Sequence, residues 1–177
     1  MAKFLISAGH GGSDPGNTAS GRVEADIAVE LRNIIALKLR NRGHDVTTDG
    51  VGKDNWVLAK AIGLISGRRA IEIHTNAGVP TAKGVEVIAT AKDSGIARAI
   101  AQGIAEVFGT VTRRDGGWFD YAKLVKEQGR TLGFVRGGGM IVETFFQSNA
   151  AELAAYDAKK WLVAEVIANT LDRGLTA

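Results

Sequence analysis

The chain has 177 residues, of which 45% are hydrophobic and 23% charged, and its formal net charge is +3. This composition is ordinary for a soluble globular protein, and the length favours a single domain over residues 1–177. The absence of cysteine excludes disulfides and thiolate metal sites, so any metal would need histidine and carboxylate ligands.

The lysines and arginines are scattered along the chain. Their slight excess favours an anionic partner but does not indicate a nucleic-acid partner. No apolar run approaches the length of a membrane span, so no stable membrane insertion is expected. We expect a monomer.

Apolar residues follow two alternating periods, one typical of strands and one typical of helices. Strand–helix alternation with short connections predicts an α/β fold, with a mostly parallel twisted sheet flanked by helices on both faces. Residues 113–139 are rich in glycine and are expected to form a long irregular surface excursion, a kind of segment that is often functional. The predicted elements, in chain order, are strand 3–8, helix 26–42, strand 45–48, helix 55–66, strands 70–74 and 84–90, helix 94–108, strand 140–144 and helix 150–171.

Three chemically active side chains stand where apolar strands are expected to close. His10 ends the run LISAGH, His74 ends AIEIH and Glu143 ends MIVE. Ligands of open α/β sheets bind beyond the carboxyl ends of the strands. Glu24 stands at the start of the first helix, and its carboxylate is expected to lie at the same edge of the sheet. The sequence therefore predicts that these four side chains gather at one site.

Two imidazoles and one carboxylate make a catalytic zinc set that leaves a fourth position for water, and a second carboxylate can then act as general base. His10, Glu24 and His74 are the candidate ligands, and Glu143 is the candidate base. Plainer alternatives are a turn histidine for His10, a core histidine for His74 and a first-turn acid that complements the helix dipole for Glu24. An unpaired buried carboxylate is costly, which a catalytic role for Glu143 would explain.

Four blocks of the sequence, in this order and with these separations, resemble a known enzyme family. They are ISAGHGGSDPG, then VEADIAVELRNIIALKLRNRGHDV, then IEIHTNAG with KGVEV, then MIVETFFQSNAAE. The chain is similar in these blocks to the zinc-dependent N-acetylmuramoyl-L-alanine amidases of the Amidase_3 family, and the resemblance covers most of the chain outside residues 113–139.

The resemblance implies an α/β fold, a Zn²⁺ cofactor held by His10, Glu24 and His74, and a catalytic glutamate at Glu143. It implies peptidoglycan as the substrate, cleaved at the amide between the lactyl group of N-acetylmuramic acid and L-alanine. One alternative is a zinc peptidase or deacetylase that acts on another amide. Another is a non-catalytic wall-binding protein, which would be expected to have lost a ligand or Glu143.

The chain departs from the family pattern at three places, none of which is a ligand. Glu72 stands two residues before His74, where the family usually has a small residue. Residues 46–50, VTTDG, lack the arginine that commonly follows the second strand, and RGGGM replaces a segment that often carries proline. Because residues two apart in a strand share a face, Glu72 is expected to bond a ligand histidine or a neighbour of the metal. The alternative is an ion pair with Arg68 or Arg69.

For other residues near these blocks, the sequence suggests a role or leaves two interpretations open. Asp14 is expected to shape its turn. Asn76 either orients the site or touches substrate, or it forms a turn. The aromatic residues Trp118, Phe119 and Tyr121 either stack on a sugar or peptide, or pin their segment to the core.

A wall hydrolase must reach peptidoglycan outside the cytoplasmic membrane, and this chain shows no signal peptide, anchor or wall-binding module. We therefore expect a phage lysin that stays in the host cytoplasm until another protein permeabilises the membrane, and then acts in the periplasm on the cell wall. The lack of an anchor suits a thin, Gram-negative wall. The alternative is a bacterial remodelling amidase whose export sequence has been removed.

Overall fold

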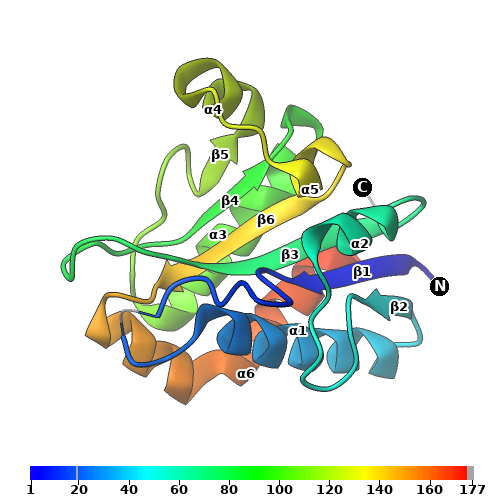
Figure 1. The fold of residues 1–177 in the computed structure, drawn as a ribbon, viewed down its shortest axis with the longest axis horizontal. Helices are drawn as coiled ribbons and strands as arrows, with labels where there is room; N and C mark the ends of the chain where they lie inside the picture. The colour runs from blue at the N-terminus through cyan, green and yellow to red at the C-terminus, as the bar shows by residue number, and fades with distance from the viewer. Residues whose placement is uncertain (19, 175–177) are drawn as a thin grey trace.

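The computed structural model describes residues 1–18 and 20–174, and the strands of this part form one six-stranded sheet in the order β2-β1-β3-β6-β4-β5 (Figure 1). Strands β2, β1, β3 and β6 run parallel, whereas β4 is antiparallel to β6 and parallel to β5. The predicted mostly parallel sheet is confirmed, with a reversed pair at one edge. The strands are β1 (Lys3–Ala8), β2 (Asp45–Thr48), β3 (Arg69–Asn76), β4 (Glu86–Ala89), β5 (Trp118–Asp120) and β6 (Met140–Phe146).

Helices cover both faces of the sheet, as the sequence predicts (Figure 1). One face packs on α1 (Glu24–Asn41), α3 (Ser94–Phe108) and α6 (Ala150–Arg173) around the larger apolar cluster. The other face packs on three short helices around a smaller cluster: α2 (Leu58–Gly63), α4 (Tyr121–Gln128) and α5 (Gly133–Arg136). A 3₁₀ turn, η1 (Ala91–Asp93), precedes α3. Among the described helices, none is both long and apolar enough to cross a membrane.

Alternation along β3 decides which face carries polar groups. Ile71 and Ile73 belong to the larger apolar cluster, and Ala70 belongs to the smaller one. Successive side chains of a strand point to opposite faces, so Glu72 and His74 lie on the face covered by α2, α4 and α5. The short helices of that face leave room at the sheet edge for a site.

Helix α1 forms because its apolar residues share one stripe. Ile27, Leu31 and Ile35 are fully buried against the sheet. Gly43, two residues past the end of the helix, adopts a φ of 82°, a left-handed conformation that favours glycine. The helix begins at Glu24, whose negative charge suits the positive end of the helix dipole.

The irregular excursion predicted for residues 113–139 is wrong, because this segment contains β5, α4 and α5. Helix α4 begins where the Asp120 side chain accepts a hydrogen bond from the Ala122 amide at 3.0 Å, and it ends at Gly129, whose φ is 64°. Leu124 buries this helix in the smaller cluster. These elements have only three, eight and four residues, so they are too short to show an apolar period between the frequent glycines.

Two strands also continue further than predicted. Strand β3 runs on to Asn76 and β6 to Phe146, so His74 and Glu143 do not close their strands. The pairing of β3 with β6 shifts register between His74 and Asn76. Both strands therefore extend past His74 and Glu143, which are register partners just before this shift.

The helix predicted over residues 55–66 is shorter, because its first residues bind neighbouring loops. The side-chain amide of Asn55 donates to the carbonyls of Ala8 and Gly9 at 3.2 Å each. The backbone amide of Trp56 donates to the carbonyl of Asp49 at 2.9 Å. Asn55 therefore holds the end of β1 and Trp56 holds the loop after β2, and neither residue belongs to the helix.

Candidate metal centre and active site

Three side chains stand in a row across neighbouring strands. His74 on β3 is the register partner of Glu143 on β6, and Glu143 is the partner of Glu86 on β4. Because β4 runs in the opposite direction, its first residue meets the carboxyl ends of β1, β3 and β6. His10 lies two residues after β1, and Glu24 opens α1 beside the same edge. The structure thus brings together the four residues that the sequence selects.

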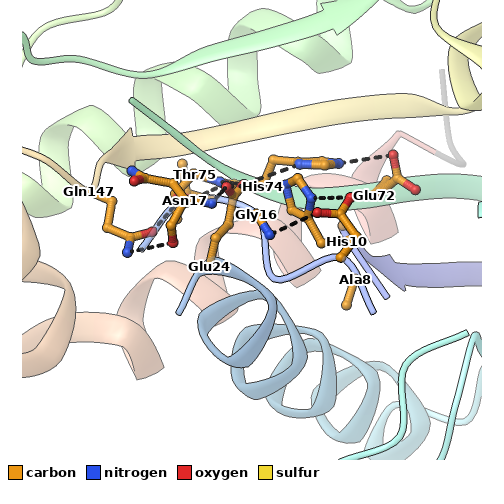
Figure 2. Close-up of polar contacts among 12 residues, drawn as sticks. Ala8, His10, Gly16, Asn17, Glu24, Glu72, His74, Thr75 and Gln147 are labelled. Atoms are coloured by element: carbon orange, nitrogen blue, oxygen red, sulfur yellow. Dashed lines mark hydrogen bonds and ion pairs between the residues drawn. The ribbon is translucent and has the colours of Figure 1, made fainter. Parts of the chain in front are cut away.

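His10, Glu24 and His74 form the tightest part of this site (Figure 2). Nε2 of His10 lies 3.1 Å from one carboxylate oxygen of Glu24, and Nδ1 of His74 lies 3.2 Å from the other. One ligand atom from each residue lies within 4.8 Å of the others. Two imidazole nitrogens and one carboxylate oxygen therefore converge on one small volume.

The far nitrogen of each imidazole contacts a second carboxylate. Nδ1 of His10 lies 2.9 Å from Oδ2 of Asp14, and Nε2 of His74 lies 3.1 Å from Oε2 of Glu72. A carboxylate behind a metal-binding histidine fixes the ring orientation and makes the inner nitrogen a better donor. The predicted contact of Glu72 with His74 is confirmed, and Asp14 contacts His10 as well as the Gly16 amide of its turn.

The ion pair considered as the alternative for Glu72 is wrong. The Arg68 guanidinium donates to Oγ1 of Thr47 at 3.2 Å and to a backbone carbonyl of the preceding loop. The Arg69 guanidinium donates to two backbone carbonyls at the end of α6, at 3.0 and 2.8 Å. Neither arginine reaches Glu72.

The loop after β1 is held in an unusual shape around His10. His10 has a φ of 60°, which few residues other than glycine adopt. The Asn55 amide also bonds the His10 carbonyl and so fixes this turn. A Cβ atom on Gly9 would lie 2.2 Å from the His74 ring, and one on Gly16 would lie 2.6 Å from the His10 ring. Glycine is required at these two positions for the rings to approach.

Gln147, directly after β6, fixes the loop that leads to Glu24, and the sequence analysis did not find it. Its side-chain amide donates to the carbonyls of Asn17 and Arg22 at 3.2 and 2.6 Å, and to the Ser20 hydroxyl at 3.0 Å. Its oxygen accepts from the Thr75 hydroxyl at 2.9 Å (Figure 2). These contacts join segments far apart in sequence, so no local pattern marks them.

Glu24 is ionised in this site. Burial opposes ionisation, but hydrogen bonds to His10 and His74 hold the pKa of its carboxyl far below the usual range. The backbone amides of Asn17 and Thr75 also donate to it, at 3.0 and 2.9 Å. The carboxylate is therefore fixed in both charge and position.

The surroundings of His10 and His74 favour the protonated form of each imidazole. The hydrogen bond to Glu24 raises the pKa of His10. Burial would lower the pKa of His74, but its hydrogen bonds to Glu24 and Glu72 raise that pKa to about 10. The carboxylates thus create a potential in which positive charge between the two rings is favourable.

Glu143 is the least satisfied polar group of the site. Among the partners within residues 1–18 and 20–174, its buried Oε2 has no hydrogen-bond donor. Burial raises the pKa of its carboxyl to about 7, although the charge of His74 opposes this shift. A carboxyl that titrates near neutrality can both accept and release a proton, as a general base must.

The donor set fits a zinc ion. Zinc in catalytic sites takes two imidazoles and a carboxylate and keeps an open position, and His10, Glu24 and His74 supply this set. Glu143 lines the same cavity, and its buried Oε2 has no hydrogen-bond donor among the described residues. A cavity of about 490 Å³ contains all four residues, so the site is open to a ligand.

Contacts within the fold favour one interpretation for Asn76 and one for the aromatic residues. The Asn76 side-chain amide donates to Oε1 of Glu86 at 3.0 Å, so Asn76 supports a carboxylate of the site wall. Phe119 is buried in the smaller cluster, Nε1 of Trp118 donates to the Ala89 carbonyl, and the backbone amide of Leu132 donates to the Tyr121 hydroxyl. The aromatic residues therefore pin their segment to the core.

Comparisons with known proteins agree with this geometry. The model of the Amidase_3 family, described as N-acetylmuramoyl-L-alanine amidase, matches residues 4–173. A crystal structure assigned as an N-acetylmuramoyl-L-alanine amidase of Neisseria meningitidis is 35% identical, with a TM-score of 0.88, over 99% of this chain and 97% of that one.

More distant structures share the fold. The catalytic domain of CwlV, an amidase of Paenibacillus polymyxa, is 20% identical with a TM-score of 0.81, over 99% of each chain. The catalytic domain of the endolysin CD27L, which targets Clostridia difficile, is 20% identical with a TM-score of 0.71, over 98% of each chain. The Bacillus subtilis protein YqiI is 31% identical over 84 residues, which are 46% of this chain and 41% of that protein, so the match spans less than half of YqiI. Since the family model covers nearly the whole chain, the chain belongs to the N-acetylmuramoyl-L-alanine amidase family Amidase_3.

Proposed function

We propose that the chain is a zinc-dependent hydrolase of peptidoglycan that cleaves the amide between the lactyl group of N-acetylmuramic acid and L-alanine. One observation carries the proposal: His10, Glu24 and His74 present three ligand atoms within 4.8 Å of one another. The family membership supplies the bond that is cleaved.

The roles of the side chains follow from their positions. When bound, zinc supplies a Lewis acid for the scissile carbonyl and lowers the pKa of a water molecule toward about 7. The Glu143 carboxylate accepts the proton of the attacking water and then donates it to the departing amine of L-alanine. Its elevated pKa, about 7, suits both transfers.

Asp14 and Glu72 orient the two histidines. Each carboxylate accepts a hydrogen bond from the outer N–H of its imidazole, so the inner nitrogen can present its lone pair to a metal. Glu24 needs no such help, because two backbone amides hold its oxygens. The three candidate ligand side chains are therefore held in place before substrate binds.

A panel of three defined amides tests the proposal against its rivals. The zinc-loaded protein is incubated with a muramyl peptide, with the free stem peptide and with an N-acetylated glycan lacking peptide. We expect cleavage of the muramyl–L-alanine bond alone. Cleavage within the stem peptide indicates a peptidase, loss of acetate indicates a deacetylase, and binding to peptidoglycan without cleavage indicates a wall-binding protein.

We further propose that the chain acts as a phage lysin, held in the host cytoplasm until the membrane is permeabilised and then active in the periplasm on the cell wall. The net charge of +3 favours approach to anionic wall polymers. The fold is shared with an endolysin catalytic domain.

Expression of residues 1–177 inside Gram-negative cells tests the lysin role. We expect little lysis before a membrane-permeabilising agent is added and rapid lysis after it, and no lysis with the Glu143→Gln variant. Spontaneous lysis without the agent, or a leader encoded upstream of Met1 in the native gene, would indicate an exported remodelling amidase instead.

A further inference from the structure

Two consecutive arginines line the wall of the catalytic cavity beyond Glu143. Arg113 and Arg114 precede β5 and border the same cavity as His10, Glu24 and Glu143. The mechanism above gives them no role. Their own contacts indicate one.

Both arginines bond one buried carboxylate. Nε of Arg113 and Nε of Arg114 lie 3.3 and 3.1 Å from the same oxygen, Oε2 of Glu86. The other oxygen of Glu86 accepts from Asn76 at 3.0 Å. Glu86 is only 6% exposed, so this anchor is rigid. One negative charge thus faces two positive charges, so these three side chains together carry a net positive charge.

Each guanidinium also stacks on an aromatic ring. The Arg113 guanidinium lies 4.8 Å from the ring centre of Phe146, and that of Arg114 lies 4.3 Å from the ring centre of Phe119. A guanidinium bonded through Nε and stacked on its face can still donate from its two terminal nitrogens, in the planar fork that matches a carboxylate.

The terminal nitrogens of both arginines are available. Within the described part of the chain, the hydrogen bonds from these two side chains go from Nε to Glu86. The side chains remain 33% and 43% exposed. Two anchored, partly exposed forks on the wall of the cavity that Glu143 also lines can hold an anion.

The backbone supports this interpretation. Arg114 has a φ of 54°, and among the described residues other than glycine only His10 shares such a conformation. A left-handed conformation at a non-glycine residue is costly and is found at functional sites. The two such residues of this chain are a candidate metal ligand and an arginine of the same cavity.

We propose that Arg113 and Arg114 bind a free carboxylate of the stem peptide on the amine side of the scissile bond, an inference that rests on the proposed function. A stem peptide whose second residue is a glutamate joined through its side-chain carboxyl offers its α-carboxylate there. The arginines select a substrate in which this group is ionised.

The row formed by His74, Glu143 and Glu86 across the sheet indicates the direction in which the peptide extends. The amine leaves beside Glu143, and Glu86 is the next residue in that row, away from His74. Neighbouring strands are about 4.8 Å apart, and consecutive Cα atoms about 3.8 Å apart. A peptide whose amine leaves beside Glu143 can therefore place its second residue at the arginines.

Two synthetic muramyl peptides that differ only at the second residue test the proposal, one with a free α-carboxylate and one with an α-carboxamide. We expect kcat/KM to be about 10-fold to 100-fold higher for the free acid, mostly through KM, because charge-assisted bidentate hydrogen bonds are lost with the amide. The double variant Arg113→Gln/Arg114→Asn should cleave the two substrates with about equal kcat/KM. Asparagine is chosen because it tolerates the left-handed conformation.

Arg136→Gln is the matched control, because Arg136 is exposed and lies outside the cavity. It should keep the preference of the parent. Equal kcat/KM for the two substrates in the parent, or an unchanged preference in the double variant, would overturn the proposal while leaving the amidase function intact. Cleavage of neither substrate would overturn the proposed function itself, and this proposal with it.

Discussion

Glu72 and His74 lie two residues apart on β3, and a carboxylate oxygen of Glu72 lies 3.1 Å from Nε2 of the His74 ring. The opposite ring nitrogen faces Glu24 at 3.2 Å. The imidazole is therefore held between a carboxylate of the metal set and one behind it.

Substitution Glu72→Gln should weaken zinc binding. The amide keeps the size of the side chain but removes the charge that makes His74 a strong donor, and such partners are worth about 10-fold to 100-fold in affinity or activity. Competition with a chromophoric chelator measures the zinc Kd. Glu106→Gln, at an exposed position of α3, is the control and should match the parent. An unchanged Kd in Glu72→Gln would show that the contact does not support the metal.

Substitution Glu143→Gln should abolish turnover but keep the fold and the metal. It removes only the proton acceptor, and general-base catalysis contributes about 10² to 10⁴-fold. Turnover of a muramyl peptide, zinc content and thermal unfolding are measured on the same preparation. Activity close to that of the parent would rule out Glu143 as the base.

Metal removal should abolish activity, and added zinc should restore it. Zinc should also stabilise the fold by about 2.7 kcal/mol when its free concentration is 100 times its Kd. Magnesium should do neither, because it prefers oxygen ligands and the set contains two imidazoles. Full activity after verified metal removal would contradict the metal assignment.

Arg32 and Asp49 form an ion pair of 3.0 Å in which both side chains are 0% exposed. Asp49 also accepts from the Ser7 hydroxyl at 2.6 Å and from the Ala8 amide at 3.0 Å, so the pair holds the end of β1 just before His10. The cation of the pair comes from α1, so the pair also ties this helix to β1.

Substitution Arg32→Leu should destabilise the fold by about 3–5 kcal/mol, since it leaves a buried carboxylate without its cation. Urea unfolding measures the change. The double variant Arg32→Leu/Asp49→Asn should recover part of the loss, because the unpaired charge is gone. Arg136→Leu, an exposed control, should stay within about 0.5 kcal/mol of the parent. A loss of less than about 1 kcal/mol in Arg32→Leu would show that the pair is not needed for stability.

The alternating strands and helices could be predicted from the sequence, because apolar periods are local. The meeting of His10, Glu24 and His74 could also be predicted, because parallel strands bring their carboxyl ends to one edge. The strand ends at His74 and Glu143 could not, since the pairing of β3 with β6 decides how far both strands continue.

The arginine pair was missed for a similar reason. Glu86 and Arg113 are separated by a whole helix, and their contact depends on the reversed direction of β4 beside β6. Residues 113–139 gave no warning either, because α4 and α5 have only eight and four residues, too few to show an apolar period. Contacts between residues far apart in the chain produce no periodic pattern in the sequence.

Analysis of the products released from purified peptidoglycan tests the central claim most directly. Sacculi are digested with the zinc-loaded protein, with Glu143→Gln in parallel, and new amino termini and soluble fragments are identified by mass spectrometry. We predict stem peptides with a free N-terminal L-alanine and glycan strands that carry free lactyl carboxylates, with neither in the variant. New reducing sugar ends, or cleavage within the stem peptide while the lactyl–alanine bond stays intact, would contradict the account.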